Sequence, residues 1–161
     1  MYRLITDDST AHNSTKSAKI TQSVVSVNAS NIKVYYNNVP IEKDTIYTLA
    51  FWAKVDVLEG KQRELDVYAQ TLDDIPKVVF LRTITLDSVD WKEYVNVFTV
   101  PKGVEGNVMI SLLVGLSNVD FWIDDFRFFE GEPTDEIKAG ETPVNPTNKI
   151  PVSWGQIKSL R

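Results

Sequence analysis

Cysteine is absent from the 161 residues of this chain, which excludes both disulfide bonds and thiolate metal sites. No apolar run approaches the roughly 20 residues of a membrane-spanning helix, so we expect no membrane span. Met1-Tyr2-Arg3-Leu4 does not read as a signal peptide, because no apolar segment follows it. The net charge of -5 argues against nucleic acid as a partner.

Groups that could carry out catalysis are also scarce. His12 is the only histidine and lies in a Ser/Thr/Asn-rich stretch without a partner, so we expect a solvated loop histidine. No nucleophile-elbow motif accompanies it. Neighbouring residues on a strand point to opposite faces, so adjacent acids cannot supply the two facing carboxyls of a glycosidase; these pairs are Asp7-Asp8, Asp73-Asp74 and Asp124-Asp125. We therefore predict that the protein is not an enzyme and has no catalytic residue.

Apolar residues recur with a period of two along most of the chain, in stretches rich in β-branched and aromatic residues. Gly, Pro, Asn and Asp clusters separate these stretches, and no helical period precedes residue 150. The pattern predicts an all-β fold, an antiparallel β-sandwich of the jelly-roll type. The expected strands are 17–27, 31–39, 45–57, 63–70, 78–86, 91–100, 107–115 and 120–129.

The composition changes after residue 130. Residues 131–151 are rich in Pro, Gly, Thr and Glu, which is typical of a linker after a domain that spans residues 1–130. Residues 152–161 form a short amphipathic segment in which Trp154, Ile157 and Leu160 recur every three residues, as on one side of a short helix. This segment reads as a docking or sorting element, as a piece that packs on the open edge of its own domain, or as a frayed end.

The stretch from Tyr47 to Lys54 alternates most clearly. Leu49 and Phe51 fall on the face expected to be core, whereas Trp52 and Lys54 fall on the other face. A tryptophan among polar neighbours on an outer face is a candidate binding platform. The alternative is an outer face that a loop covers.

Tyr68 is expected on the outer face beside Trp52, provided that both strands belong to one sheet, because Leu65, Val67 and Ala69 read as core. Asp66, Tyr68 and Gln70 should then share the outward side, although Tyr68 could equally be an ordinary cross-strand packing residue. Of the adjacent Tyr35 and Tyr36, one should face outward, and we favour Tyr36. Trp91 is expected in the core, and Trp122 either in the core or at its rim.

Asp124 and Asp125 interrupt an apolar strand, and buried carboxylates need a cation or backbone donors. One interpretation is a calcium site with oxygen ligands from an Asp and from loop carbonyls near residues 12–16. The other is that one Asp caps a loop while its neighbour faces water.

Four segments follow one another along the chain: Ser17-Ala18-Lys19-Ile20, Tyr47-Thr48-Leu49-Ala50-Phe51-Trp52-Ala53-Lys54, Trp91-Lys92-Glu93-Tyr94 with Phe98, and Phe121-Trp122-Ile123-Asp124-Asp125-Phe126. In this order and spacing they resemble carbohydrate-binding modules of the family 4, 9, 16 and 22 type, which have a galactose-binding-like jelly roll. The resemblance covers roughly residues 2–130.

The resemblance implies a non-catalytic module that binds a polysaccharide or oligosaccharide on a concave sheet face. It also implies a structural calcium ligated by Asp124, attachment to a glycoside hydrolase, and an extracellular or cell-surface location. A sugar site needs flat aromatic faces, here Trp52 and Tyr68, with polar groups at their rim. We expect those groups among Lys54, Asp66, Gln70, Tyr36 and Glu93, with a neutral β-linked glycan such as a xylan or β-glucan as ligand.

The chain also departs from the family pattern. Such modules normally open with an extra strand that bears a Phe-Glu pair, and this sequence begins after that point. Either a preceding segment is missing, or another segment fills the open sheet edge. The alternative function is a structural or adhesive β-sandwich of a surface protein that binds no glycan, in which Trp52 and Tyr68 would be buried under a loop.

Overall fold

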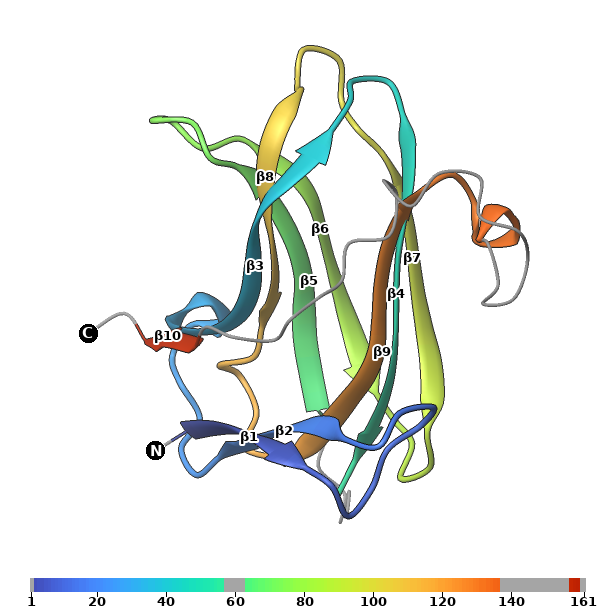
Figure 1. Ribbon diagram of the computed structural model, residues 1–161. Helices are drawn as coiled ribbons and strands as arrows, with labels where there is room; N and C mark the ends of the chain where they lie inside the picture. Colours follow the sequence, from blue (N-terminus) through green and yellow to red (C-terminus); the bar gives the residue numbers. More distant parts are fainter. Residues whose placement is uncertain (1, 57–62, 137–156, 160–161) are drawn as a thin grey trace.

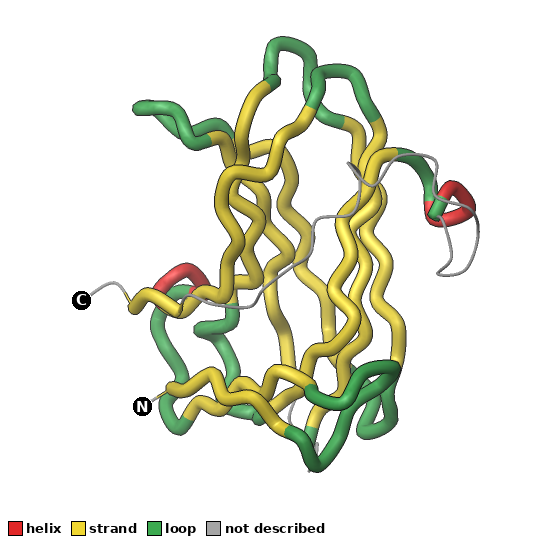
Figure 2. Tube along the Cα trace, in the orientation of Figure 1, coloured by secondary structure: helices red, strands yellow, loops and turns green. Residues whose placement is uncertain are grey.

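The computed structural model describes residues 2–56, 63–136 and 157–159, which form two five-stranded antiparallel sheets packed face to face (Figures 1 and 2). Sheet A has the order β1 (Tyr2–Asp7), β2 (Ser17–Gln22), β9 (Phe121–Glu130), β4 (Ile46–Val55) and β7 (Lys92–Thr99). Sheet B has the order β10 (Ile157–Ser159), β3 (Ile32–Ile41), β8 (Gly106–Leu113), β5 (Arg63–Thr71) and β6 (Val78–Leu86). Two 3-10 turns, Ala29–Asn31 and Pro133–Asp135, are the only helical pieces of the described chain. The predicted all-β sandwich is confirmed.

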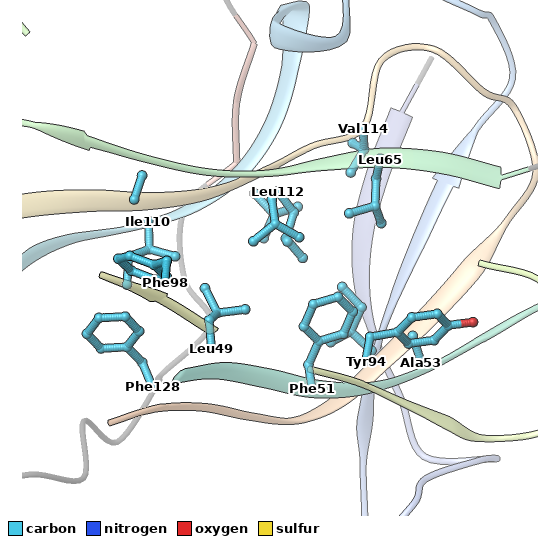
Figure 3. Packing of buried hydrophobic residues seen from close by; sticks show 14 of the residues in the cluster. Leu49, Phe51, Ala53, Leu65, Tyr94, Phe98, Ile110, Leu112, Val114 and Phe128 are labelled. Atoms are coloured by element: carbon cyan, nitrogen blue, oxygen red, sulfur yellow. The ribbon is translucent and has the colours of Figure 1, made fainter. Parts of the chain in front are cut away.

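The core lies between the sheets and follows the alternation of the sequence. Leu49, Phe51 and Ala53 of β4 point inward and are 1%, 0% and 0% exposed. They meet side chains such as Leu65 of β5 and Leu112 of β8 from the opposite sheet (Figure 3). An inward position on each strand is therefore apolar, and the intervening position is available for a surface function.

Each of the eight predicted strands overlaps one of β2 to β9, with one clear difference in length. β2 ends at Gln22 rather than at residue 27. The side-chain Nε2 of Gln22 donates to the backbone carbonyls of Val24 and Gly115, and the Ser26 N–H also donates to the Gly115 carbonyl. These bonds turn the chain away from the sheet, and Val27 there is 87% exposed.

One edge of each sheet is formed by a strand that the sequence patterns do not predict. β1 pairs along its whole length with β2. β10 pairs antiparallel with β3, from Ile157 opposite Val34 to Ser159 opposite Ile32. The helical interpretation of the tail is wrong for residues 157–159, whereas the rest of the tail and most of the predicted linker lie outside the described residues. The domain boundary at residue 130 stays a prediction. Within the described ranges, no helix is long and apolar enough to cross a membrane.

Candidate functional site

The predicted site residues lie on two different sheets. Trp52 and Lys54 belong to β4 of sheet A, whereas Tyr68 belongs to β5 of sheet B, together with Asp66 and Gln70. All of these residues alternate with buried core positions, so they face outward on opposite sides of the sandwich. The expectation that Trp52 and Tyr68 form one platform is therefore wrong, and the molecule offers two separate candidate surfaces.

The outer face of sheet B carries a row of four cross-strand neighbours. Ser111 of β8 lies opposite Tyr35 of β3 on one side and opposite Tyr68 of β5 on the other. Tyr68 in turn lies opposite Leu81 of β6, which is 56% exposed. Strands are spaced by about 4.8 Å, so the two tyrosines stand about 10 Å apart with only a small serine between them. We call this row the tyrosine row.

Ser111 is the unusual member of the tyrosine row. Its side chain is on the outward side of the sheet, yet the residue is only 1% exposed. Its hydroxyl Oγ has no hydrogen-bond partner among the described residues. A buried hydroxyl without a partner costs free energy, so an unpaired hydroxyl on a sheet face is a feature that needs an explanation.

Polar side chains flank the tyrosine row along β5. The Tyr68 hydroxyl donates a hydrogen bond of 2.8 Å to Gln70 Oε1. The Thr83 hydroxyl of β6 donates one of 2.6 Å to Asp66 Oδ1. These bonds orient the ring of Tyr68 and the carboxylate of Asp66, so the face combines an aromatic ring with amide, hydroxyl and carboxylate groups.

Tyr36 was expected to face outward, and the structure corrects this. Tyr36 lies opposite Ile110 of β8 and packs against the core, whereas its neighbour Tyr35 is on the outer face. A β-bulge between Tyr36 and Val39 shifts the register only after this point, with Asn38 in the left-handed region at φ 60. The alternation Ile32, Val34, Tyr36 therefore continues inward, and Tyr35 is the residue that sequence reasoning missed.

On the outer face of sheet A, Trp52 is covered on one side by a histidine. The ring centroids of Trp52 and His12 are 3.6 Å apart, and their planes differ by 12°. His12 is therefore not a solvated loop residue, and its Nδ1 is buried without a hydrogen-bond partner among the residues described. The outward orientation of Trp52 agrees with the prediction, and the contact with His12 agrees with the alternative in which a loop covers this face. These contacts do not test whether Trp52 binds a ligand.

Two further tryptophans lie near Lys54. Trp122 of β9 is buried at the outer face of sheet A, with its indole N–H 2.7 Å from Asp7 Oδ2, and Trp91 is partly exposed rather than part of the core. The Lys54 ammonium lies 5.0 Å from the Trp122 ring centroid and 5.6 Å from that of Trp91. Glu93, expected at the rim, forms an ion pair with Arg127.

Asp124 is 8% exposed, and its carboxylate binds the loop that carries His12. Asp124 Oδ2 accepts a 2.7 Å hydrogen bond from the His12 N–H, the Ser14 hydroxyl lies 3.2 Å from both oxygens, and Oδ1 accepts one from the Asp125 N–H. The described residues contain no group of three or more His, Cys, Asp or Glu side chains that could hold a metal. These donors satisfy the hydrogen-bonding needs of the carboxylate without an ion. The contacts give no support to a calcium ion at Asp124, which stays a prediction.

The Asp7 carboxylate links β1 to β9, because it accepts a hydrogen bond from the Trp122 indole. This contact depends on pH, since Asp7 accepts the bond as a carboxylate. Hydrogen bonds from the Ser9 side chain and from the Trp122 indole lower the pKa of Asp7 from 3.8 to about 2. Because the folded pKa is depressed, the stability from these bonds is present above pH 3.8 and is lost as the pH falls towards 2. We expect carboxyl NMR to show a midpoint near 2, with the Trp122 indole N–H shift following it. Ser9→Ala should raise the midpoint, and a wild-type midpoint near 3.8 would contradict the assignment.

The comparisons with known proteins agree with this geometry. A family model described as "Carbohydrate binding domain" matches residues 3–112. No curated protein matches the chain.

Solved structures share the fold at low sequence identity. One described as "CBM4 structure and function" has 22% identity and a TM-score of 0.62 over 71% of each chain. The CBM22-2 xylan-binding domain of Paenibacillus barcinonensis has 17% identity and a TM-score of 0.52 over 81% of this chain and 88% of its own. A CBM22-1–GH10 xylanase structure of Clostridium thermocellum in complex with xylohexaose has 15% identity and a TM-score of 0.58 over 81% of this chain and 25% of its own.

Proposed function

The chain belongs to the carbohydrate-binding domain family, and we propose that it is a non-catalytic module that binds a neutral β-linked polysaccharide on the outer face of sheet B. The observation that carries this proposal is the tyrosine row, in which Tyr35 and Tyr68 flank the unpaired hydroxyl of Ser111. The aromatic faces can pack on the C–H patches of a sugar ring, and the Gln70 amide beside Tyr68 can bond a sugar hydroxyl.

The polar groups around Tyr68 suit a neutral ligand, and a cation near the row, Lys33, has its ammonium 5.6 Å from the Tyr35 ring centroid. The groups closest to Tyr68 that can bond a sugar hydroxyl are the amide of Gln70 and the hydroxyl of Thr83. The one nearby carboxylate, that of Asp66, is engaged by Thr83. A β-linked backbone is extended and flat, so successive sugars can lie along the sheet. An open site of this kind is expected to bind weakly, at roughly -4 to -8 kcal/mol.

We also propose that the module works outside the cell, joined to a polysaccharide-degrading enzyme. The support is the family membership and the similar fold of a xylanase structure that contains a CBM22-1 module. Xylohexaose and cellohexaose are accordingly the first ligands to test.

The test is a titration of these oligosaccharides by isothermal calorimetry into two variants. Tyr68→Ala should weaken binding by about 1–3 kcal/mol, roughly 5- to 150-fold, because it removes a large aromatic contact area. Tyr68→Phe keeps the ring and should lose only the contribution of the hydroxyl.

Trp52→Ala is the matched control on the opposite sheet and should leave the affinity unchanged. If Trp52→Ala abolishes binding while Tyr68→Ala does not, the neutral site lies on sheet A. If wild-type protein binds neither oligosaccharide nor insoluble xylan or β-glucan, the alternative of a structural or adhesive module is favoured instead.

A further inference from the structure

Lys54 differs from the other cations on the outer face of the central strands of sheet A. On β2, Lys19 Nζ lies 3.9 Å from an oxygen of Asp120, and on β9, Arg127 pairs with three carboxylates, those of Glu93, Asp125 and Glu136. Lys54 lies on β4, across β9 from Lys19, and makes no ion pair or hydrogen bond with any residue that the structure describes. Its charge is therefore available to an external anion.

The carboxylates on this face are already engaged by other groups. Asp124 accepts bonds from the His12 N–H and the Ser14 hydroxyl, and Asp7 accepts bonds from Ser9 and the Trp122 indole. The carboxylate of Glu93, opposite Trp52 in the sheet, pairs with Arg127. If one of these carboxylates moved to pair with Lys54, the donor that it now accepts from would lose its partner.

The Lys54 ammonium lies over two tryptophan rings, and that of Trp91 is accessible to a ligand. Its ammonium lies 5.6 Å from the ring centroid of Trp91, which is partly exposed, and the His12 ring lies 6.3 Å from Trp91 at 57°. Beneath Lys54 the Trp122 ring is fixed by its bond to Asp7. Lys54 lies on β4, which Figure 1 shows between β9 and β7, and Trp91 immediately precedes β7.

We infer that this surface is a second glycan site, which takes a uronic acid residue of an acidic polysaccharide. The sugar ring stacks on Trp91, and its carboxylate pairs with the Lys54 ammonium. This inference rests on the proposed carbohydrate-binding function but uses the opposite sheet from the neutral site.

The spacing favours a uronate over other anions. A uronic acid carries its carboxylate directly on the pyranose ring, so a ring stacked on Trp91 brings the charge within reach of an ammonium 5.6 Å away. The carboxylate of an Asp or Glu side chain is attached to no ring, and a neutral sugar leaves Lys54 unpaired. The net charge of -5 does not prevent such binding, because charges beyond about 8 Å are largely screened at physiological ionic strength.

The test uses α-linked trigalacturonate and β-linked triglucuronate, each compared with its uncharged methyl ester. By calorimetry, at least one acid should bind full-length protein about tenfold more tightly than its ester, and more weakly as sodium chloride is raised. Lys54→Met keeps most of the aliphatic stem and should lose the preference for the acid. Lys54→Arg keeps the charge and should retain the preference. Melting curves of both variants confirm that they are folded.

NMR separates this site from the neutral one. Trigalacturonate or triglucuronate should shift the indole N–H signals of Trp91 and Trp122, whereas xylohexaose should shift the backbone signals around Tyr68 and Ser111. The inference is overturned if neither acid binds, if acid and ester bind equally, or if the acids shift the signals of sheet B instead. Failure of xylohexaose alone would count against the neutral site and leave this one standing.

Discussion

Phe51→Ala will lower the free energy of unfolding by about 3–5 kcal/mol, the range for a buried phenylalanine that leaves a cavity. Phe51 is 0% exposed and stacks on Tyr94, at a centroid distance of 5.8 Å (Figure 3), and on Phe126, at 5.9 Å. These neighbours come from the strands on either side of β4, so the cavity would open at the centre of sheet A. Chemical denaturation followed by tryptophan fluorescence measures the loss.

The adjacent Trp52 supplies the control, because it is of similar bulk and on the opposite face of the same strand. Trp52→Ala removes one stacked pair with His12 and should cost about 1 kcal/mol. Phe51→Ala should leave the affinity for neutral oligosaccharides unchanged at temperatures where the variant is folded. Equal destabilisation by the two substitutions would mean that the inward and outward faces of β4 are wrongly assigned.

The strands and their inward faces could be predicted because both follow from one local signal. In Leu49 to Val55 or Leu65 to Ala69, every second side chain is apolar, and the sandwich buries those side chains. β1 gave a weaker signal because it is an edge strand on which most residues stay accessible, and only Tyr2 and Leu4 pack against the core. Its pairing depends on β2, which a local pattern does not contain.

The candidate site was harder to predict because alternation does not say which sheet a strand joins. β4 and β5 follow each other in the sequence, yet one enters sheet A and the other enters sheet B. The same period of two therefore sends Trp52 and Tyr68 outward in opposite directions. For Tyr35 and Tyr36 the signal was present, since Ile32 and Val34 set the inward positions, and counting from them places Tyr36 inside.

His12 shows a contact that no periodic pattern could reveal. It is held against Trp52 by bonds from its loop to Asp124, a residue more than a hundred positions away. The apolar surroundings of Asp124 did predict that its carboxylate needs partners, and the sequence left open whether these are a cation or loop donors. In the structure, backbone N–H groups and a hydroxyl fill that role.

Asp124→Ala should therefore destabilise the protein by about 1–3 kcal/mol, because it leaves the His12 N–H without its acceptor in a partly buried place and removes the contact with the Ser14 hydroxyl. Asp125→Asn is the matched control. Asp125 is partly exposed, its carboxylate lies 3.9 Å from Arg127 Nε, and its φ of 50 is a conformation that asparagine adopts readily. The control should lose under 1 kcal/mol, as expected for a partly exposed ion pair.

Melting both variants and the wild type in calcium and in EDTA decides what holds the loop. If hydrogen-bond donors alone bind the Asp124 carboxylate, the wild-type Tm is the same in both buffers, and Asp124→Ala lowers the Tm equally in each. If a calcium ion is bound, the wild-type Tm falls in EDTA, and that fall disappears in Asp124→Ala, because a ligand that binds only the folded state stabilises it by mass action. Equal losses in Asp124→Ala and Asp125→Asn would contradict the special role of Asp124. In either buffer, Asp124→Ala should also release His12 from Trp52, seen as a change in tryptophan fluorescence that Asp125→Asn does not produce.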